Sequence, residues 1–161
     1  MIIGANKDTH AGQLVTFPMG HDIYGIEILK IQEVINYQEI KQTSSVPDFI
    51  EGTIELRNSV IPIMDLKKRM GIEEITPGKK RIIILNLPER PLGIVVDDFS
   101  RVLLVDNSYY ELLPSDVMTN QAASCIEHVV KTDDSVILII SPEKILTHRE
   151  HQALESFEEK K

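Results

Sequence analysis

The sequence predicts a mainly β protein that consists of two small barrels packed together, with short helices and one of these at the C-terminus. Two observations support this fold. Short runs rich in Ile and Val alternate with turn-forming residues along the chain, which is typical of strands joined by tight turns. The chain also matches itself in two long segments, so the same strands occur twice. About five short strands in each half are enough to close a small barrel and to remove exposed sheet edges.

The internal repeat has two parts. Residues 14–34 match residues 82–102 without a gap, and residues 50–70 match residues 126–146 in the same way. Any two hairpins rich in Ile and Val align in part, but these two matches come in the same order and at nearly equal offsets. We therefore predict a structural duplication, in which each unit contains a strand, a tight turn, a strand, an irregular stretch, a hairpin and a short helix.

The turns follow from residues that accept unusual backbone angles. Residues 20–22 and 88–90 separate the first two strands of each unit, and Asn58–Ser59 and Asp133–Asp134 are the predicted hairpin tips. Asn and Asp tolerate the positive φ that two-residue hairpin turns require. Pro62 lies inside an apolar strand and cannot donate a ladder hydrogen bond, so we expect its strand at a sheet edge or with a bulge.

Two helices are expected, each after a hairpin. Asp65 is the predicted N-cap of the first helix. Ser141 is the predicted N-cap of the second, with Pro142 at its first helical position. The predicted domains are a first β-barrel subdomain over residues 12–75, a second over residues 76–148, and a charged tail or helix end over residues 149–161.

Composition and charge disfavour several classes of protein. The 161 residues carry a net charge of -8, which repels a phosphate backbone, so no nucleic-acid partner is expected. The single cysteine, Cys125, excludes an internal disulfide. The apolar runs are too short to span a bilayer, and the start does not resemble a signal peptide. These features predict a cytoplasmic protein without direct membrane insertion.

The sequence shows no pattern of an active site. Asp97 and Asp98 are adjacent in a strand, so their side chains point to opposite faces. His148 and His151 have the spacing of helical neighbours, but no third ligand accompanies them, so no metal site is expected. Cys125 is interpreted as a buried thiol. We therefore predict that the chain is not an enzyme, has no catalytic residues and uses no cofactor.

Three motifs carry a resemblance to a known family. Residues 22–37 (DIYGIEILKIQEVINY), 46–72 (VPDFIEGTIELRNSVIPIMDLKKRMGI) and 81–103 (RIIILNLPERPLGIVVDDFSRVL) resemble the CheW family of chemotaxis coupling proteins, and the resemblance covers residues 12–148. It implies two five-stranded SH3-like barrels. It also implies a non-catalytic adaptor that couples the tips of methyl-accepting chemoreceptors to the histidine kinase CheA and scaffolds both in membrane-associated arrays. The kinase would bind through its own CheW-like regulatory domain.

The resemblance also implies a receptor-binding groove between the barrels. Arg57 matches the arginine of a family motif that usually reads Asn-Leu-Arg-Gly and here reads Glu-Leu-Arg-Asn. Its counterpart in the repeat is Asp133, so the hairpin itself does not require an arginine, and we expect Arg57 to point outward to a partner. The predicted groove residues are Ile28, Ile31, Glu33, Val34, Arg57, Val95 and Val96.

One alternative stays open from the residues alone. A small-ligand-binding β-barrel or a hydrolase would need a deep pocket lined by two or more titratable groups.

Overall fold

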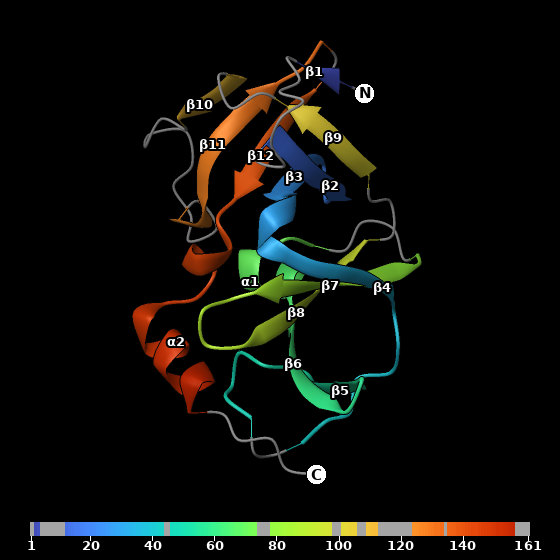
Figure 1. The fold of residues 1–161 in the computed structure, drawn as a ribbon, viewed down its shortest axis with the longest axis vertical. Coiled ribbons are helices and arrows are strands. Elements are labelled where there is room, and N and C mark those ends of the chain that lie inside the picture. Colours follow the sequence, from blue (N-terminus) through green and yellow to red (C-terminus); the bar gives the residue numbers. More distant parts are fainter. Residues whose placement is uncertain are drawn as a thin grey trace.

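The computed structural model describes residues 2–3, 12–43, 46–73, 78–97, 101–105, 109–112, 124–133 and 135–156. Its strands form two sheets, one in the upper and one in the lower half of Figure 1. The first has the order β1-β9-β2-β3-β12-β11-β10 and contains β1 (Ile2–Ile3), β2 (Gln13–Met19), β3 (Asp22–Glu27), β9 (Arg101–Val105), β10 (Tyr110–Leu112), β11 (Ile126–Lys131) and β12 (Val136–Ile140). The second has the order β4-β7-β8-β6-β5 and contains β4 (Ile31–Asn36), β5 (Gly52–Leu56), β6 (Ser59–Asp65), β7 (Lys80–Asn86) and β8 (Pro91–Asp97). We call them the seven-stranded and the five-stranded sheet.

The two sheets do not divide the chain in sequence order. The β2–β3 hairpin belongs to the first repeat unit, yet it pairs with β9 and β12 of the second. In the same way, the β7–β8 hairpin of the second unit pairs with β4 and β6 of the first. The strand membership implied by the boundaries 12–75 and 76–148 is therefore wrong. Each unit contributes its first hairpin to the sheet that holds the other unit's strands. A local sequence pattern does not reveal this exchange, because both hairpins can pair with the equivalent strands of either unit.

The duplication itself is visible in the pairing. The repeat matches β2, β3, β9, β11 and β12 to β7, β8, β4, β5 and β6, and this substitution converts the order β9-β2-β3-β12-β11 into β4-β7-β8-β6-β5. The register is kept to the residue. Gly25 pairs with Ile139 in one sheet, and its counterpart Gly93 pairs with Ile63 in the other. The predicted duplication is confirmed at the level of individual backbone partners.

Three apolar clusters hold the molecule together. One lies within the five-stranded sheet around Ile63 and Ile82, and one within the seven-stranded sheet around Leu14 and Ile139. The largest lies between the sheets, because it takes side chains from β2, β3, β7 and β8 together. Burial of this apolar area is the main source of stability, so the exchanged hairpins supply the interface between the two halves as well as strands to each.

Glycine is required at Gly52, where the chain passes close to another segment. A Cβ there would lie 2.5 Å from the backbone oxygen of Lys41 and 2.6 Å from Cγ2 of Ile40. Lys41 and Thr53 exchange backbone hydrogen bonds of 2.8 and 2.9 Å at this point. The missing side chain therefore lets the segment after β4 lie against β5.

The β5–β6 turn differs by one residue from its prediction. Its tip is Arg57–Asn58 rather than Asn58–Ser59, and both residues have positive φ, 49° and 67°. These angles fit the two-residue hairpin turn whose twist matches that of the strands. Pro62 does not lie in an edge strand, since β6 has neighbours on both sides. It precedes Ile63, the first residue paired with β8, so its missing N–H interrupts no ladder on that side.

The described residues form two short α-helices. In α1 (Leu66–Met70), Asp65 accepts a hydrogen bond from the Lys68 backbone N–H, as predicted for its N-cap. The predicted cap of the second helix is wrong: Ser141 precedes a 3-10 turn (Pro142–Lys144), and α2 (His148–Glu155) begins at Thr147, which forms a capping box with Glu150. Among the described residues, no helix is long and apolar enough to cross a membrane.

Candidate functional site

The predicted site centres on β4, an outer strand of the five-stranded sheet. The register shifts between Ile31 and Glu33, where two residues of β4 oppose a single step along β7. This bulge interrupts the simple alternation of side chains. As a result, Ile31 and Val34 both pack against the cluster between the sheets, whereas Ile35 packs against the interior of the five-stranded sheet.

An apolar strip runs along the start of β4 and the 3-10 turn before it (Ile28–Lys30). Ile28, Ile31 and Val34 are half-buried against the inter-sheet cluster. Leu29 is 60% exposed. We call these four residues the β4 strip. Lys30 holds the turn in place, because its Nζ lies 3.3 Å from Oε2 of Glu143, in the segment after β12. The strip is a partly exposed apolar surface of the kind that marks interaction sites.

Val95 and Val96 do not belong to this surface. Val95 is 5% exposed and packs inside the five-stranded sheet, while Val96 is 1% exposed and packs between the sheets. Adjacent strand residues point to opposite faces, so the two side chains could not have lined one groove. Neither side chain is therefore exposed for direct contact with a receptor, and this geometry gives no support to their predicted place in the groove.

Arg57 and Glu33 form an ion pair, with Nη2 of Arg57 2.7 Å from Oε2 of Glu33. Glu33 lies in β4 and Arg57 follows β5, and these strands are the two ends of the sheet order. The pair therefore joins opposite edges of the sheet, which must curl until they meet. The bridge between Lys41 and Thr53 also joins the segment after β4 to β5, so the five-stranded sheet closes into a barrel.

The Arg57 side chain remains 69% exposed despite this contact. Its backbone is in the left-handed region, which costs a non-glycine residue about 1 kcal/mol. The second carboxylate oxygen of Glu33, Oε1, is buried and has no hydrogen-bond partner within the described structure. Glu33 thus orients the guanidinium, while most of the guanidinium stays available to another molecule.

The predicted groove residues therefore lie in three places. Ile28, Ile31 and Val34 share the strip with Leu29, whose exposure the sequence did not single out. Arg57 and Glu33 lie together at the rim of the five-stranded barrel. Val95 and Val96 are core residues.

A clamp between the helices fixes the C-terminal segment. Nη1 of Arg69 in α1 donates a hydrogen bond of 2.6 Å to Oε2 of Glu150 in α2, and Nη2 donates to the other oxygen. Burial works to raise the pKa of Glu150, but the hydrogen bonds from Arg69 and from the Thr147 backbone outweigh it and hold this pKa below its usual value. Leu154, on the same helix, is fully buried in the inter-sheet cluster.

The residues that were considered as catalytic or metal-binding candidates have ordinary structural contacts. Cys125 is buried, and burial raises the pKa of its thiol to about 11, as expected of an unreactive cysteine. His151 contacts the carboxylate of Glu89 at 2.8 Å. The described part of the chain holds no group of three His, Cys, Asp or Glu side chains that could bind a metal ion.

Comparison with known proteins agrees with this architecture. A family model described as the CheW-like domain matches residues 13–150. The chain is 33% identical over 147 residues to a protein named chemotaxis protein CheW from Treponema pallidum. The aligned region covers 88% of this chain and 86% of the relative. It is 28% identical over 142 residues to the protein of the same name from Bacillus subtilis, and this alignment covers 88% of the chain and 90% of the relative.

A solved structure shows the same fold. It is the scaffolding protein TtCheW from Thermoanaerobacter tengcongensis, with 36% sequence identity and a TM-score of 0.71 over 81% of this chain and 88% of that one. The family model spans all strands from β2 to β12 and reaches into α2. The chain belongs to the CheW-like domain family.

Proposed function

We propose that this chain is a non-catalytic adaptor in bacterial chemotaxis. It couples the cytoplasmic tips of methyl-accepting chemoreceptors to the histidine kinase CheA, and it helps to scaffold both in arrays at the membrane. The relatives that it matches along most of their length are named chemotaxis proteins, and the similar solved structure is described as a scaffolding protein. The adaptor works from the cytoplasm and is recruited to the membrane by its partners.

One observation carries the proposal: the family match extends over both sheets and the interface between them. An adaptor needs two partner surfaces held at a fixed relation. The shared inter-sheet cluster provides this, because its buried side chains come from both sheets and cannot slide past one another without losing contacts.

The receptor surface in this proposal is the β4 strip. A receptor tip is a helical hairpin, and an amphipathic helix binds by laying its apolar face against an apolar groove. Ile28, Ile31 and Val34 supply the floor of that surface and Leu29 its exposed edge. Arg57, oriented by Glu33, supplies a cation at the barrel rim for a carboxylate or a carbonyl of a partner.

Sedimentation tests the function directly. A receptor cytoplasmic fragment in vesicles, the kinase and this protein are mixed singly, in pairs and together. The expected result is that the kinase sediments with the receptor in a larger amount, and phosphorylates faster, when this protein is present. The proposal fails if the protein leaves both quantities unchanged, or if it sediments with neither partner.

A further inference from the structure

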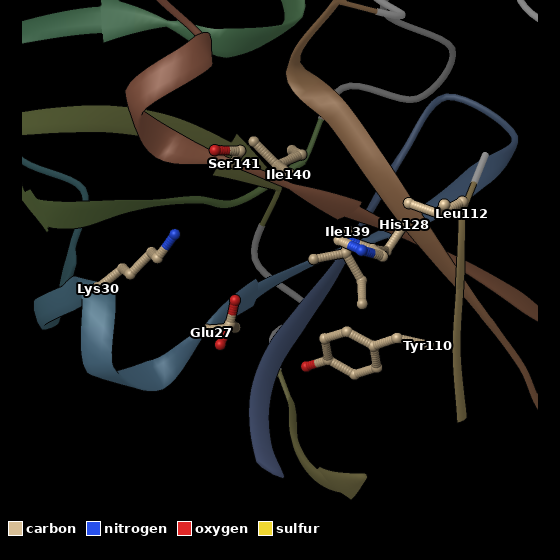
Figure 2. Close-up of a pocket in the computed structure, with 8 residues that line it drawn as sticks. All are labelled: Glu27, Lys30, Tyr110, Leu112, His128, Ile139, Ile140 and Ser141. Carbon is tan, nitrogen blue, oxygen red and sulfur yellow. The ribbon is translucent and has the colours of Figure 1, made fainter. Parts of the chain in front are cut away.

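A second site lies on the seven-stranded sheet. It is a pocket of about 360 Å³ between β3, the 3-10 turn, β10, β11 and the end of β12. Figure 2 shows side chains from all five segments around one space. The lining residues are Glu27, Lys30, Tyr110, Leu112, His128, Ile139, Ile140 and Ser141. Its volume falls within the range of small-molecule sites.

The internal repeat shows that the fold does not need this polar lining. The counterpart of Glu27 is Val95, and the counterpart of His128 is Gly52. Glu111 pairs with Val129 as Lys41 pairs with Thr53, so the counterpart of Tyr110 is Ile40. At the equivalent position, the five-stranded sheet has a valine, a glycine and an isoleucine where the seven-stranded sheet has three polar side chains.

Two of these polar groups lack partners. Within the described residues, no hydrogen bond or ion pair reaches the carboxylate of Glu27. The hydroxyl of Tyr110 is occluded from solvent and has no hydrogen-bond partner among the described residues, although a buried unsatisfied polar group costs about 1–3 kcal/mol. Burial, together with the nearby charge of Glu27, raises the pKa of Tyr110 to about 12. The hydroxyl therefore keeps its proton at neutral pH and remains a donor.

The other lining residues give the pocket a cationic side, an apolar wall and a pair of rings. Lys30 and Ser141 both contact Glu143, at 3.3 Å and 3.2 Å, and Lys30 forms the cationic side of the pocket. Leu112 and Ile139 form an apolar wall. The Tyr110 and His128 rings lie with their centroids 5.7 Å apart.

We propose that this pocket binds a small amine that has an oxygen acceptor next to its ammonium group and an apolar substituent, the chemistry shared by amino alcohols and amino acids. The ammonium donates to Glu27, the oxygen accepts from the Tyr110 hydroxyl, and the substituent lies against Leu112 and Ile139. Tyr110 belongs to an outer strand of the described sheet, so a small outward shift of β10 brings its hydroxyl into contact. The site adds to the proposed adaptor function and does not depend on it.

The test is a titration of the isotope-labelled full-length protein followed by NMR. Phenylalaninol represents the amino alcohols and phenylalanine the amino acids, and 3-phenyl-1,2-propanediol replaces the amine by a hydroxyl. The expected result is saturable shifts at β3, β10 and β11 with at least one of the two amines, and none with the diol. Stronger binding of phenylalanine would assign the amino acids. Equal shifts with the diol, or no saturable shifts with either amine up to its solubility limit, would overturn the proposal.

Matched variants locate the contact. Glu27→Gln removes the charge that pairs with the ammonium and should weaken binding by about tenfold. Glu111→Gln is the control: it also removes a carboxylate next to Tyr110, but this carboxylate is exposed and lies 3.6 Å from Lys131. Unchanged affinity in folded Glu27→Gln contradicts the proposal, as does an equal loss in the control. Tyr110→Phe keeps the ring and should bind more weakly while unfolding at a higher temperature, because an unsatisfied hydroxyl is removed. If its affinity is unchanged, the hydroxyl does not contact the ligand and the assigned chemistry is wrong.

Discussion

The guanidinium of Arg57 lies 2.7 Å from the carboxylate of Glu33 and links the first and last strands of the five-stranded sheet. Both residues belong to the surface that the family resemblance implies, but they differ in exposure. Arg57 is largely in solvent, whereas Glu33 has one buried oxygen that has no hydrogen-bond partner in the described part of the chain. The arginine is therefore the member of the pair that another molecule can reach.

We expect Arg57→Glu to abolish receptor-coupled kinase activation with little loss of stability. Exposed ion pairs contribute about 0–1 kcal/mol, so the thermal midpoint should move only slightly, and the measurement is kinase activity in reconstituted arrays. Asp133→Lys, at the counterpart position, should leave activation intact.

Arg57→Gly separates the side chain from the backbone. Glycine adopts positive φ without the cost that arginine bears, so this variant should be as stable as the parent or more so, and still fail to activate the kinase. Normal activation in Arg57→Gly would show that the arginine serves the turn alone.

Leu29→Glu should weaken receptor binding while the fold is retained. Leu29 is exposed, so the change is expected to alter stability by no more than about 0.5 kcal/mol, but a charge on the strip must be desolvated without a partner when a helix binds. Cosedimentation with the receptor fragment measures the loss. Val136→Glu, another exposed apolar residue but on β12, is the control. An equal effect of both variants would argue against the β4 strip as the receptor surface.

Val96→Asp should unfold the protein rather than affect binding alone. Its side chain lies in the inter-sheet cluster, where a carboxylate has no partner, and the expected cost is about 4 kcal/mol or more. Urea denaturation followed by circular dichroism provides the measurement. A folded Val96→Asp variant with normal stability and impaired receptor binding would restore Val96 to the binding surface.

The exchanged hairpins predict that the repeat units do not fold separately. A fragment of residues 1–75 contains β2 and β3 without their partners β9 and β12, and a fragment of residues 76–161 lacks the partners of β7 and β8. Each should be unfolded alone, and the two should form a folded complex when they are mixed, as NMR spectra would show. A well-dispersed spectrum of either fragment alone would contradict the exchange.

The clamp between α1 and α2 predicts a pH-dependent contribution to stability. The pKa of Glu150 is lowered in the folded state from a reference value of 4.5, so its contribution is complete above that value and is lost as the pH falls through the folded-state pKa. Arg69→Gln should therefore destabilise the protein at neutral pH more than at about pH 3. Lys131→Gln removes an exposed pair with Glu111 and should show no such difference. Equal effects of Arg69→Gln at both values would exclude the linkage.

Much of the fold could be predicted because its elements depend on local signals. The repeat predicted the strands, Asp65 predicted the start of α1, and Gly20, which has a positive φ, lies in the turn predicted over residues 20–22. The Thr147 cap was missed because Ser141 and Pro142 also form a helix-start pattern, which the chain uses for a 3-10 turn. The sequence alone does not rank these two helix-start patterns, because the packing of the following residues decides which of them begins the α-helix.

The site was harder to predict because its geometry depends on strand order and register. The bulge after Ile31 decides which side chains of β4 face the inter-sheet cluster, and nothing in the residues around it marks the bulge. In the sequence, Val95 and Val96 fit the pattern of an apolar surface. In the structure, Val95 packs inside the five-stranded sheet and Val96 packs between the two sheets. The polar lining of the pocket was not recognised because Glu27, Tyr110 and His128 are far apart in sequence and meet only across the exchanged strands.

The exchange of hairpins also has a consequence for synthesis on the ribosome. The five-stranded sheet is complete once β8 has emerged, but β2 and β3, which are made before any of its strands, must wait for β9 and β12. During this interval β4 and β6 are already present, and they follow the same register rules as β9 and β12. A nascent chain can therefore pair its first hairpin transiently within its own unit, in an arrangement that lacks the inter-sheet cluster, is not stable by itself and must open again when β7 and β8 arrive. The symmetry that makes the two barrels alike thus creates a kinetic competitor, and late long-range pairing of this kind slows folding.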